Sequence, residues 1–318
     1  MIQKQLIPTK DEKFDFGAAS KLPKIDRRDG GSIGRKIQPP PRRSILGAFT
    51  RSKVKLFIFC GYTYFLLFAS LLHANFPDLK VLVLIIASDD IPAYVEDQKI
   101  WQTYMHKDPA HIEAYFLKNR SDLVADVQID GDTIWVKGEE NLKPGILNKT
   151  IAAMEFLLPK IQTTFTHVLR TNLSSFFCFS RLLEFLETCP PYRLYTSGGS
   201  FPGHYSNLQK EYFGLGSGCG FLLSPDLVAL LVEHKKDLAL TSSTVNDDVC
   251  IGLFLREKLG VTCMETRRMD FWTAQDLTQP IPSTIFHFRI KHPNQQTRAQ
   301  NEHCIFQKLL TEFYTQKK

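Results

Sequence analysis

The sequence lacks the short motifs that mark several common classes of nucleotide-binding and hydrolytic enzyme. No G-x-G-x-x-G follows the first predicted strand, which argues against a dinucleotide-binding domain. No G-x-x-x-x-G-K-[S/T] occurs, which argues against a P-loop nucleotidase, and residues 78–318 contain no G-x-S-x-G, the nucleophile motif of α/β-hydrolases. The seven cysteines include no C-x-x-C pair, so they form no metal-binding pattern.

The cysteines leave the redox state of the chain open. Cys60 lies inside an apolar segment, and six cysteines follow it. In an oxidising compartment these six could pair, but their spacing does not give the connectivity, and buried free thiols are the alternative. The six are Cys178, Cys189, Cys219, Cys250, Cys263 and Cys304.

The first 55 residues contain few acidic and few aromatic residues. They hold 14 Lys and Arg against 5 acidic residues, a formal charge of +9, whereas the whole chain carries +6. A segment of this composition cannot bury enough apolar surface to fold, so we predict a disordered basic tail over 1–55 that lies in the cytosol. Because the excess positive charge is confined to this tail, no nucleic-acid partner is expected.

Residues 56–72 contain no charged residue, and three basic residues stand just before them. Seventeen uncharged residues are near the shortest length that spans a bilayer. A core helix of this length would show a polar face, and a cleaved secretory signal would not begin after 55 residues. We therefore predict a transmembrane signal anchor over residues 56–74, with the following chain in the lumen. A short span is typical of the early secretory pathway, which predicts a single-pass type II membrane protein of the Golgi apparatus or endoplasmic reticulum.

Residues 78–318 alternate strand-like and helix-like stretches. The run at 79–88 is a continuous apolar segment rich in β-branched residues, which is typical of a strand buried on both faces. The repeated alternation predicts one α/β domain with a mainly parallel sheet. We expect strands over 79–88, 111–119, 132–139 and 166–172, and helices over 147–161 and 180–188.

Polar clusters follow three of these stretches, at the ends where ligands of parallel sheets bind. They are Ser88-Asp89-Asp90, residues 170–175 (RTNLSS) and residues 216–220 (GSGCG). The glycines of the last cluster either allow a bulge or let the backbone approach a ligand closely, and both interpretations stay open. After them, Ser224 and Pro225 are expected as the N-cap and first-turn residue of a helix.

Two adjacent carboxylates, Asp247 and Asp248, stand directly before an apolar run. Desolvating a charge is costly, so this position requires a reason. Together with Asn246 they could cap a helix, because acidic groups at a helix N-terminus satisfy free N–H groups and interact favourably with the helix dipole. Alternatively, one carboxylate is held ready to accept a proton. From these residues alone, capping is the commoner explanation.

The order of these pieces resembles the β-1,3-glycosyltransferases of the galactosyltransferase and fringe family. The last piece is similar to the family's Glu-Asp-Val-x-x-Gly motif, with Asp247 and Asp248 in its two acidic positions. The resemblance covers residues 80–290 and implies a GT-A fold. The four similar segments are 97–104 (DQKIWQTY), 139–157 (EENLKPGILNKTIAAMEFL), 216–231 (GSGCGFLLSPDLVALL) and 246–261 (NDDVCIGLFLREKLGV).

The resemblance implies an inverting transfer of a sugar from a nucleotide-diphosphate donor, such as a UDP-sugar, to a hydroxyl of a glycan or glycoprotein. In that mechanism a carboxylate takes the proton of the acceptor; we assign this role to Asp248, with Asp247 orienting it or the acceptor. A catalytically inactive glycan-binding or scaffold protein on the same fold is the competing interpretation. The residues expected to bind the donor are Ser88, Asp89 and Asp90 near the nucleoside and, elsewhere, Lys149, Arg170, Thr171, Asn172, Ser174, Gly218, Arg289 and Lys291.

One departure from the family concerns its metal ion. Family members carry an aspartate triplet that holds Mn²⁺ on the donor diphosphate, whereas residues 172–174 here are Asn-Leu-Ser. A neutral amide and a hydroxyl are poor substitutes for carboxylate ligands. Three explanations compete: a metal held weakly by Asn172 and His287, loss of transferase activity, or neutralisation of the diphosphate by protein cations. We favour the last, with Arg170, Arg289 and Lys291 as the cations.

His287 lies in a segment, 285–293, where Phe286 and Phe288 alternate with polar residues. Such alternation is typical of a strand with one solvated face and requires no binding site. The family has a metal-binding histidine in a strand shortly after the catalytic motif, which implies His287, rather than His292, as the metal candidate.

Three N-x-S/T sequons follow the predicted anchor, at Asn119, Asn148 and Asn172. Such asparagines are modified only if they reach the lumen and remain accessible. We expect Asn119 to be exposed and glycosylated, and Asn172, at the predicted donor pocket, to be unmodified.

Overall fold

The computed structural model describes residues 78–203, 212–242, 245–294 and 296–315. Of the two compact units into which the chain divides, Met1–Tyr64 and Phe65–Lys318, only the second contains described residues. The predicted basic tail and signal anchor lie outside them, so the type II topology stays a prediction. No helix in the described ranges is long and apolar enough to cross a membrane.

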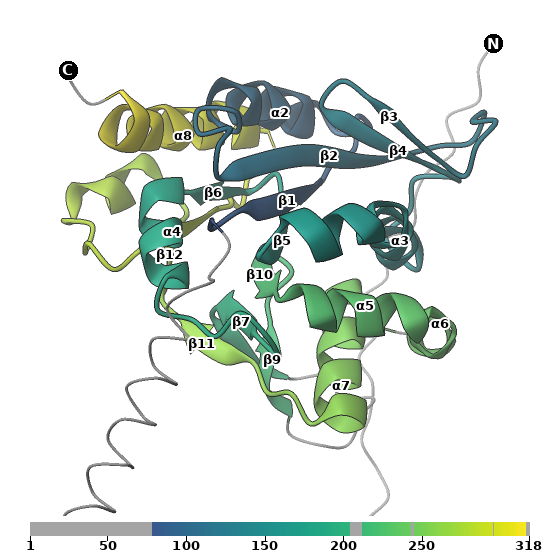
Figure 1. Ribbon diagram of the computed structural model, residues 1–318. Coiled ribbons are helices and arrows are strands. Elements are labelled where there is room, and N and C mark those ends of the chain that lie inside the picture. The colour runs from purple at the N-terminus through teal and green to yellow at the C-terminus, as the bar shows by residue number, and fades with distance from the viewer. Residues whose placement is uncertain (1–77, 204–211, 243–244, 295, 316–318) are drawn as a thin grey trace, which may run out of the picture. The chain divides into compact units, whose positions relative to one another are not determined.

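A mixed sheet of eight strands, in the order β11-β7-β10-β5-β1-β2-β4-β3, forms the centre of this unit (Figure 1). β1 pairs in parallel with β2 and β5, and β2 pairs in parallel with β4. β11 also pairs in parallel with β7, whereas β10 runs antiparallel to β5 and β7, and β3 runs antiparallel to β4. Parallel pairs are thus the majority, as predicted, but the sheet is mixed. The strands are Val81–Ile86 (β1), Ile112–Arg120 (β2), Val127–Asp130 (β3), Thr133–Lys137 (β4), His167–Asn172 (β5), Tyr195–Gly198 (β7), Gly220–Leu223 (β10) and Met264–Thr266 (β11).

A short connection explains the antiparallel pairing of β3 with β4, which the sequence analysis missed. Asp130 pairs with Thr133, so only Gly131 and Asp132 join the two strands. A two-residue loop can join only antiparallel neighbours. Gly131 has a φ of 54°, in the left-handed region that such a tight turn requires and that glycine adopts without strain.

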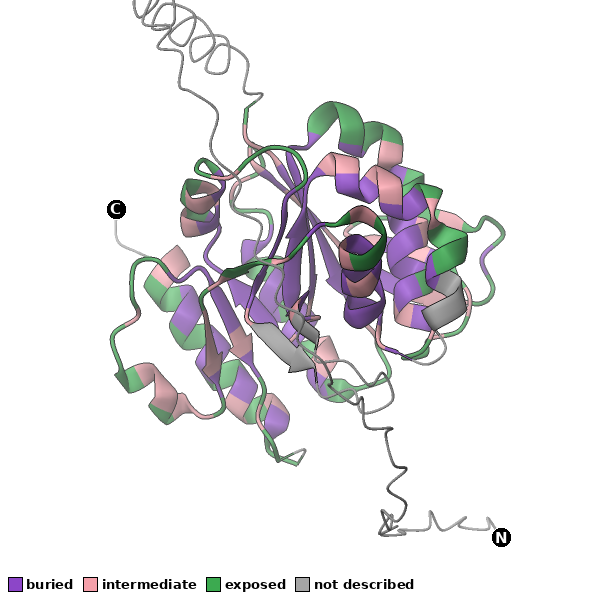
Figure 2. Ribbon diagram, turned by 90° about the horizontal axis from the view of Figure 1, so that it is seen from below, coloured by how far each residue is buried: buried purple, intermediate pink, exposed green. Residues whose placement is uncertain are grey.

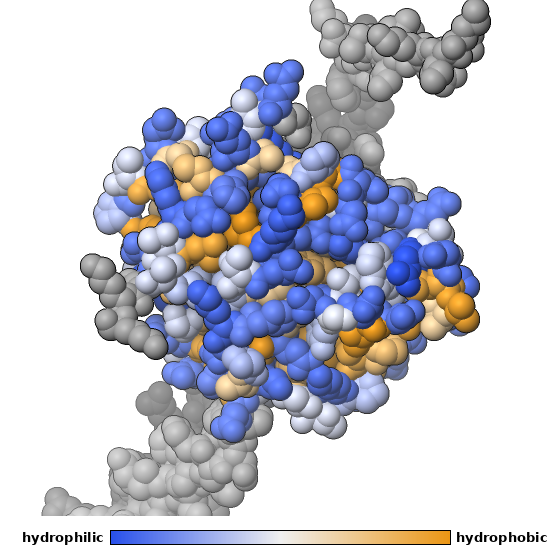
Figure 3. Space-filling model, turned by 90° about the horizontal axis from the view of Figure 1, so that it is seen from above, coloured by the Kyte–Doolittle hydropathy of each residue, from blue (hydrophilic) through white to orange (hydrophobic). Residues whose placement is uncertain are grey.

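Helices cover both faces of the sheet, which explains why β1 is buried throughout. Leu84 packs in one core cluster with Met154 of α3, and the neighbouring Ile85 packs in a second cluster with Trp101 of α2. Figure 2 shows buried strands between helices whose outer sides are exposed, and the face in Figure 3 is mostly hydrophilic. The helices are Pro92–Tyr104 (α2), Gly145–Thr164 (α3), Phe179–Leu186 (α4), Pro225–Glu233 (α5), Lys235–Ser242 (α6), Asp247–Leu259 (α7), Arg298–Tyr314 (α8) and the 3-10 helix Ala274–Thr278 (η1).

Two smaller sheets accompany the central one. β12 (Arg268–Phe271), β13 (His287–Ile290) and β6 (Ser175–Phe177) form the first, and β8 (Ser200–Gly203) and β9 (Tyr212–Gly216) form the second. Only Leu173 and Ser174 separate β5 from β6, and β6 pairs with β13. The polar residues of β13 are therefore held beside the carboxyl end of β5.

Most of the expected elements are confirmed. The predicted strands are β1, β2, β4 and β5, and the predicted helices are α3 and α4. α5 begins with Ser224 as N-cap and Pro225 in the first turn, but the Ser224 hydroxyl accepts a hydrogen bond from Leu194 N at 2.9 Å instead of capping the helix. All six cysteines of the described residues are free thiols, three of them buried.

Candidate functional site

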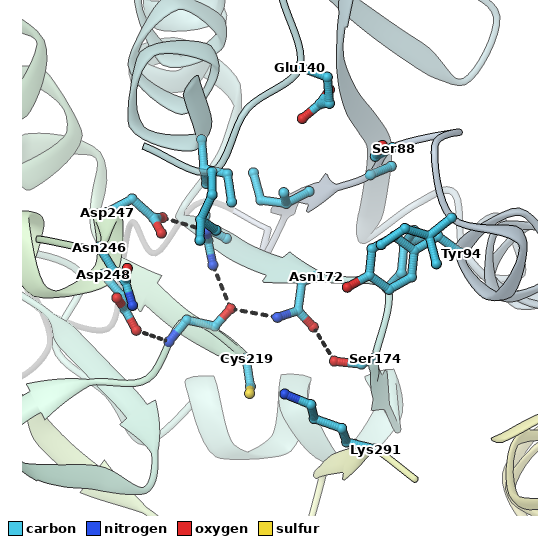
Figure 4. Close-up of a pocket in the computed structure, with 18 of the residues that line it drawn as sticks. Ser88, Tyr94, Glu140, Asn172, Ser174, Cys219, Asn246, Asp247, Asp248 and Lys291 are labelled. Atoms are coloured by element: carbon cyan, nitrogen blue, oxygen red, sulfur yellow. Dashed lines mark hydrogen bonds and ion pairs between the residues drawn. The ribbon is translucent and has the colours of Figure 1, made fainter. Parts of the chain in front are cut away.

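A cleft of about 510 Å³ lies at the carboxyl ends of β1 and β5 and at the N-terminus of α7 (Figure 4). This is the edge of a sheet where ligands of parallel strands bind. Of the predicted site residues, Asp89, Lys149, Thr171 and His287 do not line the cleft. Those that line it are Ser88, Asp90, Arg170, Asn172, Ser174, Gly218, Asp247, Asp248, Arg289 and Lys291.

Asp248 serves the helix and the cleft at the same time. Asn246 is the N-cap of α7, but its side chain makes no capping hydrogen bond. Instead, Asp248 Oδ1 accepts a hydrogen bond from Val249 N, at 2.9 Å, within the first helical turn. Asp248 Oδ2 accepts a second one from Gly218 N, at 2.7 Å (Figure 4). The carboxylate therefore satisfies a helix N–H group, as the capping interpretation requires, and still lines the cleft.

Arg170 joins three parts of the site from its position on β5. Its guanidinium donates hydrogen bonds to Asp247 Oδ2 and to the carbonyl oxygen of Gly218. The side chain is almost fully buried and lies over the ring of Phe221 on β10, 5.6 Å from its centroid. The antiparallel insertion of β10 beside β5 thus brings the loop at Gly218 to the start of α7.

The surroundings of Asp248 change its acidity. Burial raises the pKa of Asp248 and the charge of Asp247 raises it further, whereas Arg170 and the two N–H donors act in the opposite direction. A carboxylate with a raised pKa binds a proton more firmly, which suits a general base. A Cβ atom at Gly218 would lie 2.9 Å from Asp248 Oδ2, so a side chain there would displace the Asp248 carboxylate.

Lys149 lies behind the cleft wall and not in the cleft. Its buried amino group donates a hydrogen bond to Ala87 O, at 3.0 Å, and forms an ion pair with Glu140, which does line the cleft. Burial lowers the pKa of Lys149, and the charge of Glu140 opposes this effect. The pair ties the segment before α3 to the end of β1.

The polar cluster after β1 divides between the cleft and its surroundings. The hydroxyl of Ser88 donates a hydrogen bond to Asp90 Oδ2, at 3.0 Å, and both residues line the cleft. Asp89 is bound outside it by Lys118 Nζ at 2.7 Å and by Gln98 Nε2 at 3.1 Å. Partial burial acts to raise the pKa of Asp89, but these two hydrogen bonds and the charge of Lys118 bring it below its usual value.

Hydrogen bonds within the protein hold both ends of the Asn172 amide. Its Oδ1 accepts a hydrogen bond from the hydroxyl of Ser174 at 2.9 Å, and its Nδ2 donates to Gly218 O at 3.0 Å. The Ser175 hydroxyl lies 3.3 Å from the same Oδ1 but donates its hydrogen to Cys219 O at 2.6 Å. The neighbouring Thr171 is buried and donates its hydroxyl hydrogen to Cys219 O at 2.6 Å. Asn172 therefore links β5 to the loop before β10.

His287 is part of the core beneath this loop. It is 1 % exposed, and its ring stacks on Phe177 at a centroid distance of 4.3 Å. A Cβ atom at Gly198 or Gly220 would lie within 3 Å of the ring, so the backbone encloses it closely. Burial and the charge of Arg268 hold the pKa of His287 well below its usual value. The residues expected to hold Mn²⁺ thus do not fit a metal, and the described residues contain no group of three or more His, Cys, Asp or Glu that could hold one.

Two cations also line the cleft: Arg289, which lies on β13, and Lys291, which follows β13 directly. Lys291 is exposed, and its amino group makes no hydrogen bond or ion pair with any described residue. Arg289 lies 3.5 Å from Asp270 Oδ2 and 5.7 Å from the centroid of the Trp272 ring, and its Nε has no hydrogen-bond partner.

Sequence analysis missed the apolar residues at one end of the cleft. Leu142 is 65 % exposed and Ile91 is 39 % exposed, and Tyr94 and Ile146 lie with them in the wall. Exposed apolar side chains that line a cleft can contact a ligand. No motif marks these residues, although Leu142 falls inside the segment that resembles the glycosyltransferase family.

The three sequons differ in access. Asn119 was expected to be exposed, but it lies within β2, half-buried, and its Nδ2 donates to Val136 O at 3.4 Å. Asn148 is exposed on the first turn of α3, and Asn172 is held in the cleft wall. Asn148 is therefore the sequon with the accessible side chain.

No protein-family model matches the sequence, and no curated protein is significantly similar to it. Among solved structures, the chain is similar to a glycosyltransferase involved in the glycosylation of the major capsid of PBCV-1, with 7% identity and a TM-score of 0.41, over 71% of this chain and 98% of that one. It is also similar to 4-diphosphocytidyl-2C-methyl-D-erythritol synthase, with 15% identity and a TM-score of 0.32, over 60% of this chain and 90% of that one. Likeness at this level does not identify a function, so the functional inference rests on the geometry of the cleft.

Proposed function

We propose that this chain is a glycosyltransferase with a GT-A-type domain, which moves a sugar from a nucleotide-diphosphate donor to a hydroxyl of a glycan. The observation that carries the proposal is the position of Asp248. It is a buried carboxylate with a raised pKa that lines a cleft at the carboxyl ends of β1 and β5. The same cleft has cations along one wall and exposed apolar side chains at one end, as a charged nucleotide ligand requires.

The proposed chemistry is a single displacement with inversion. The acceptor oxygen forms a bond to the anomeric carbon while its proton passes to Asp248. The bond from the anomeric carbon to the diphosphate oxygen breaks on the opposite face, and the diphosphate leaves with the electron pair. The N–H groups of Gly218 and Val249 hold the carboxylate in place, and the ion pair with Arg170 fixes Asp247 beside it. General-base assistance of this kind typically contributes ~10² to 10⁴ in rate.

The nucleoside of the donor belongs, in this proposal, at the end of the cleft next to β1. Ser88 and Asp90 supply hydroxyl and carboxylate oxygens there for ribose, and Leu142 and Ile91 supply apolar surface for the base. Glu140, held by Lys149, fixes the backbone that carries Leu142. We take UDP as the donor nucleotide, following the resemblance described for the sequence.

We propose further that the chain is a type II membrane protein of the Golgi apparatus or endoplasmic reticulum, anchored through residues 56–74, with a glycan or glycoprotein as acceptor. The uncharged run and its basic flank support the anchor. A β-1,3 linkage is the outcome that the resemblance implies.

The test is a screen of the full-length protein, purified in mild detergent, against a panel of UDP-sugars with measurement of UDP release. Release from one donor that depends on Asp248 supports the proposal. Asp97→Asn is a matched control, because Asp97 is also a buried carboxyl with a raised pKa but does not line the cleft. Release that is unaffected by Asp248→Asn contradicts the assigned base.

An inactive glycan-binding protein is the second candidate, and one observation favours it. Residues 172–174 contain no carboxylate, and Asn172 is used for structural hydrogen bonds. Binding of glycans without any release of UDP from the whole donor panel favours this candidate over the transferase.

A further inference from the structure

We infer that the cleft binds the diphosphate of its nucleotide ligand without a metal ion, through Lys291 and Arg289. This inference rests on the proposed function, because it concerns the same cleft and the same donor. It departs from the metal-dependent pattern that the resemblance implies. Three sets of observations carry it: the partners that the oxygen ligands already have, the ion-pair partners that the two cations lack or share, and the positions of these groups in the cleft.

Each carboxylate of the cleft forms a hydrogen bond or an ion pair with a different partner. Asp247 pairs with Arg170, Glu140 pairs with Lys149, and Asp90 accepts the Ser88 hydroxyl. Asp248 accepts two backbone N–H groups. Mn²⁺ requires several oxygen or imidazole ligands that converge on one point. The described residues contain no group of three or more His, Cys, Asp or Glu that could hold a metal ion, and the Asn172 oxygen already accepts the Ser174 hydroxyl.

The two cations, in contrast, have no partner or only a shared one among the described residues. The amino group of Lys291 has no partner among the described residues and is exposed at the cleft. Arg289 shares Asp270 with Arg268, which binds both carboxylate oxygens of Asp270 at 2.5 and 3.0 Å, whereas Arg289 lies 3.5 Å away. The positive charge of Arg289 is thus only partly balanced. Together the two side chains carry the same formal charge as one divalent cation.

The order of the groups fits a nucleoside diphosphate. In Figure 4, Asp248 lies on one side of the cleft and Ser88 and Tyr94 lie on the other, and Lys291 lies below Asn172 and Ser174 with its amino group between the two sides from left to right. A diphosphate that links a nucleoside near Ser88 to a sugar near Asp248 would pass Lys291. Charge-assisted hydrogen bonds from Lys and Arg to phosphate are about twice as strong as neutral ones, so these two cations would contribute strongly to binding it.

The experiment measures binding of UDP, GDP, ADP and CDP to the full-length protein by calorimetry, once in EDTA and once in Mn²⁺. We expect at least one nucleotide to bind with the same affinity in both. Binding that appears only in Mn²⁺ overturns the metal-free site and leaves the proposed function intact. No binding of any nucleotide, with or without Mn²⁺, contradicts the proposed function itself.

Substitutions then test the two cations. Lys291→Ala should weaken binding in EDTA by about 10- to 100-fold, the usual cost of a lost hydrogen bond to a charged group. Lys308→Ala, at an exposed position of α8, is the matched control and should change nothing. Arg289→Gln should weaken binding further without unfolding the protein, because Asp270 keeps both hydrogen bonds from Arg268. Unchanged affinity in the Lys291→Ala, Arg289→Gln double variant contradicts the assignment.

Discussion

The molecule contains two buried acidic pairs that look alike in composition and differ in access. In the first, Asp247 and Asp248 begin α7 and are accompanied by Arg170. In the second, Asp97 of α2 lies near Glu302 of α8, and the latter pairs with an arginine of its own helix. Burial raises the pKa of Asp248, Asp97 and Glu302 alike. Only the first pair lines the cleft.

The second pair is enclosed between helices. Asp97 is 1 % exposed, and its Oδ2 has no hydrogen-bond partner. Glu302 is fully buried and accepts hydrogen bonds from Arg298 Nε, at 2.9 and 3.0 Å, and from His292 N at 2.9 Å. Nothing in this arrangement offers the carboxyl groups to a ligand. A raised pKa therefore follows from burial in both places, and only access to a cleft separates a candidate base from a structural group.

The largest difference between the pairs should appear in catalysis. Asp248→Asn removes the proton acceptor, so we expect UDP-sugar turnover to fall by about 10² to 10⁴ while nucleotide affinity is retained. Asp97→Asn should leave turnover close to that of the unmodified protein. Turnover and affinity are measured on both variants beside thermal unfolding. If the Asp97→Asn protein is folded and loses as much turnover as Asp248→Asn, the prediction that only the cleft pair takes part in catalysis is wrong.

The next largest effect concerns stability. Arg298→Met leaves the fully buried Glu302 carboxylate without its cation, so we expect a loss of about 3–5 kcal/mol in the free energy of unfolding, measured with urea. Arg170→Met should cost less, because water in the cleft can reach Asp247. The double variant Arg298→Met, Glu302→Gln should recover most of the loss, since glutamine still accepts the hydrogen bond from His292 N. Equal losses for the two arginines would contradict the difference in access.

A smaller effect is the dependence of stability on pH. Burial first, and the charge of Glu302 second, raise the pKa of Asp97 from 3.8 to about 8. Between these values the folded protein keeps a proton that the unfolded chain releases, so stability should fall as the pH rises from about 4 toward about 8. One such group contributes up to about 1.4 kcal/mol per pH unit. Asp97→Asn should flatten the curve measured by chemical unfolding at several pH values, and an unchanged slope would show that another group titrates.

The smallest expected effect is a difference in glycosylation between a sequon on the outer surface and one in the cleft wall. Asn148 is exposed on α3, whereas Asn172 lines the cleft. After expression in a eukaryotic secretory pathway, we expect a glycan on Asn148 and none on Asn172, with no change in activity when Asn148→Gln removes the first. Glycopeptide mass spectrometry measures both. Full occupancy of Asn172 would block the cleft and contradict the proposed donor site, and a wholly unmodified chain would speak against the lumenal topology.

Much of the fold could be predicted from local patterns. The run that forms β1 is buried on both faces because its alternate residues, such as Leu84 and Ile85, pack on helices of opposite faces. The start of α7 was readable from Asp247 and Asp248, since acidic groups satisfy helix N–H groups in any context. The β3–β4 hairpin could also have been predicted from its two-residue Gly-Asp turn, Gly131 and Asp132, and was not.

The predictions about metal ligands could not be decided in this way. An imidazole such as His287 is a common metal ligand and the amide of Asn172 a poor one, but the contacts of both residues come from distant parts of the chain. Asn172 is bound to Gly218, 46 residues later, and His287 is enclosed by Gly198 and Gly220. The residue type determines which bonds a side chain can form, whereas its neighbours in the fold determine whether its donor and acceptor atoms are still available to a ligand.

The sequence by itself determined the α/β class, the main strands and helices, and the position of a carboxylate pair at the start of a helix. These features depend on periodicity, capping and turn chemistry, which act over a few residues. Only the tertiary structure decided that the sheet is mixed and that Asp248 lines a cleft while Asp97 does not. It also decided that the Lys291 amino group has no partner among the described residues, whereas the Asn172 side chain is hydrogen-bonded. The physical reason is that burial and hydrogen-bond partners depend on which distant segments meet, and here the insertion of β10 beside β5 sets those contacts.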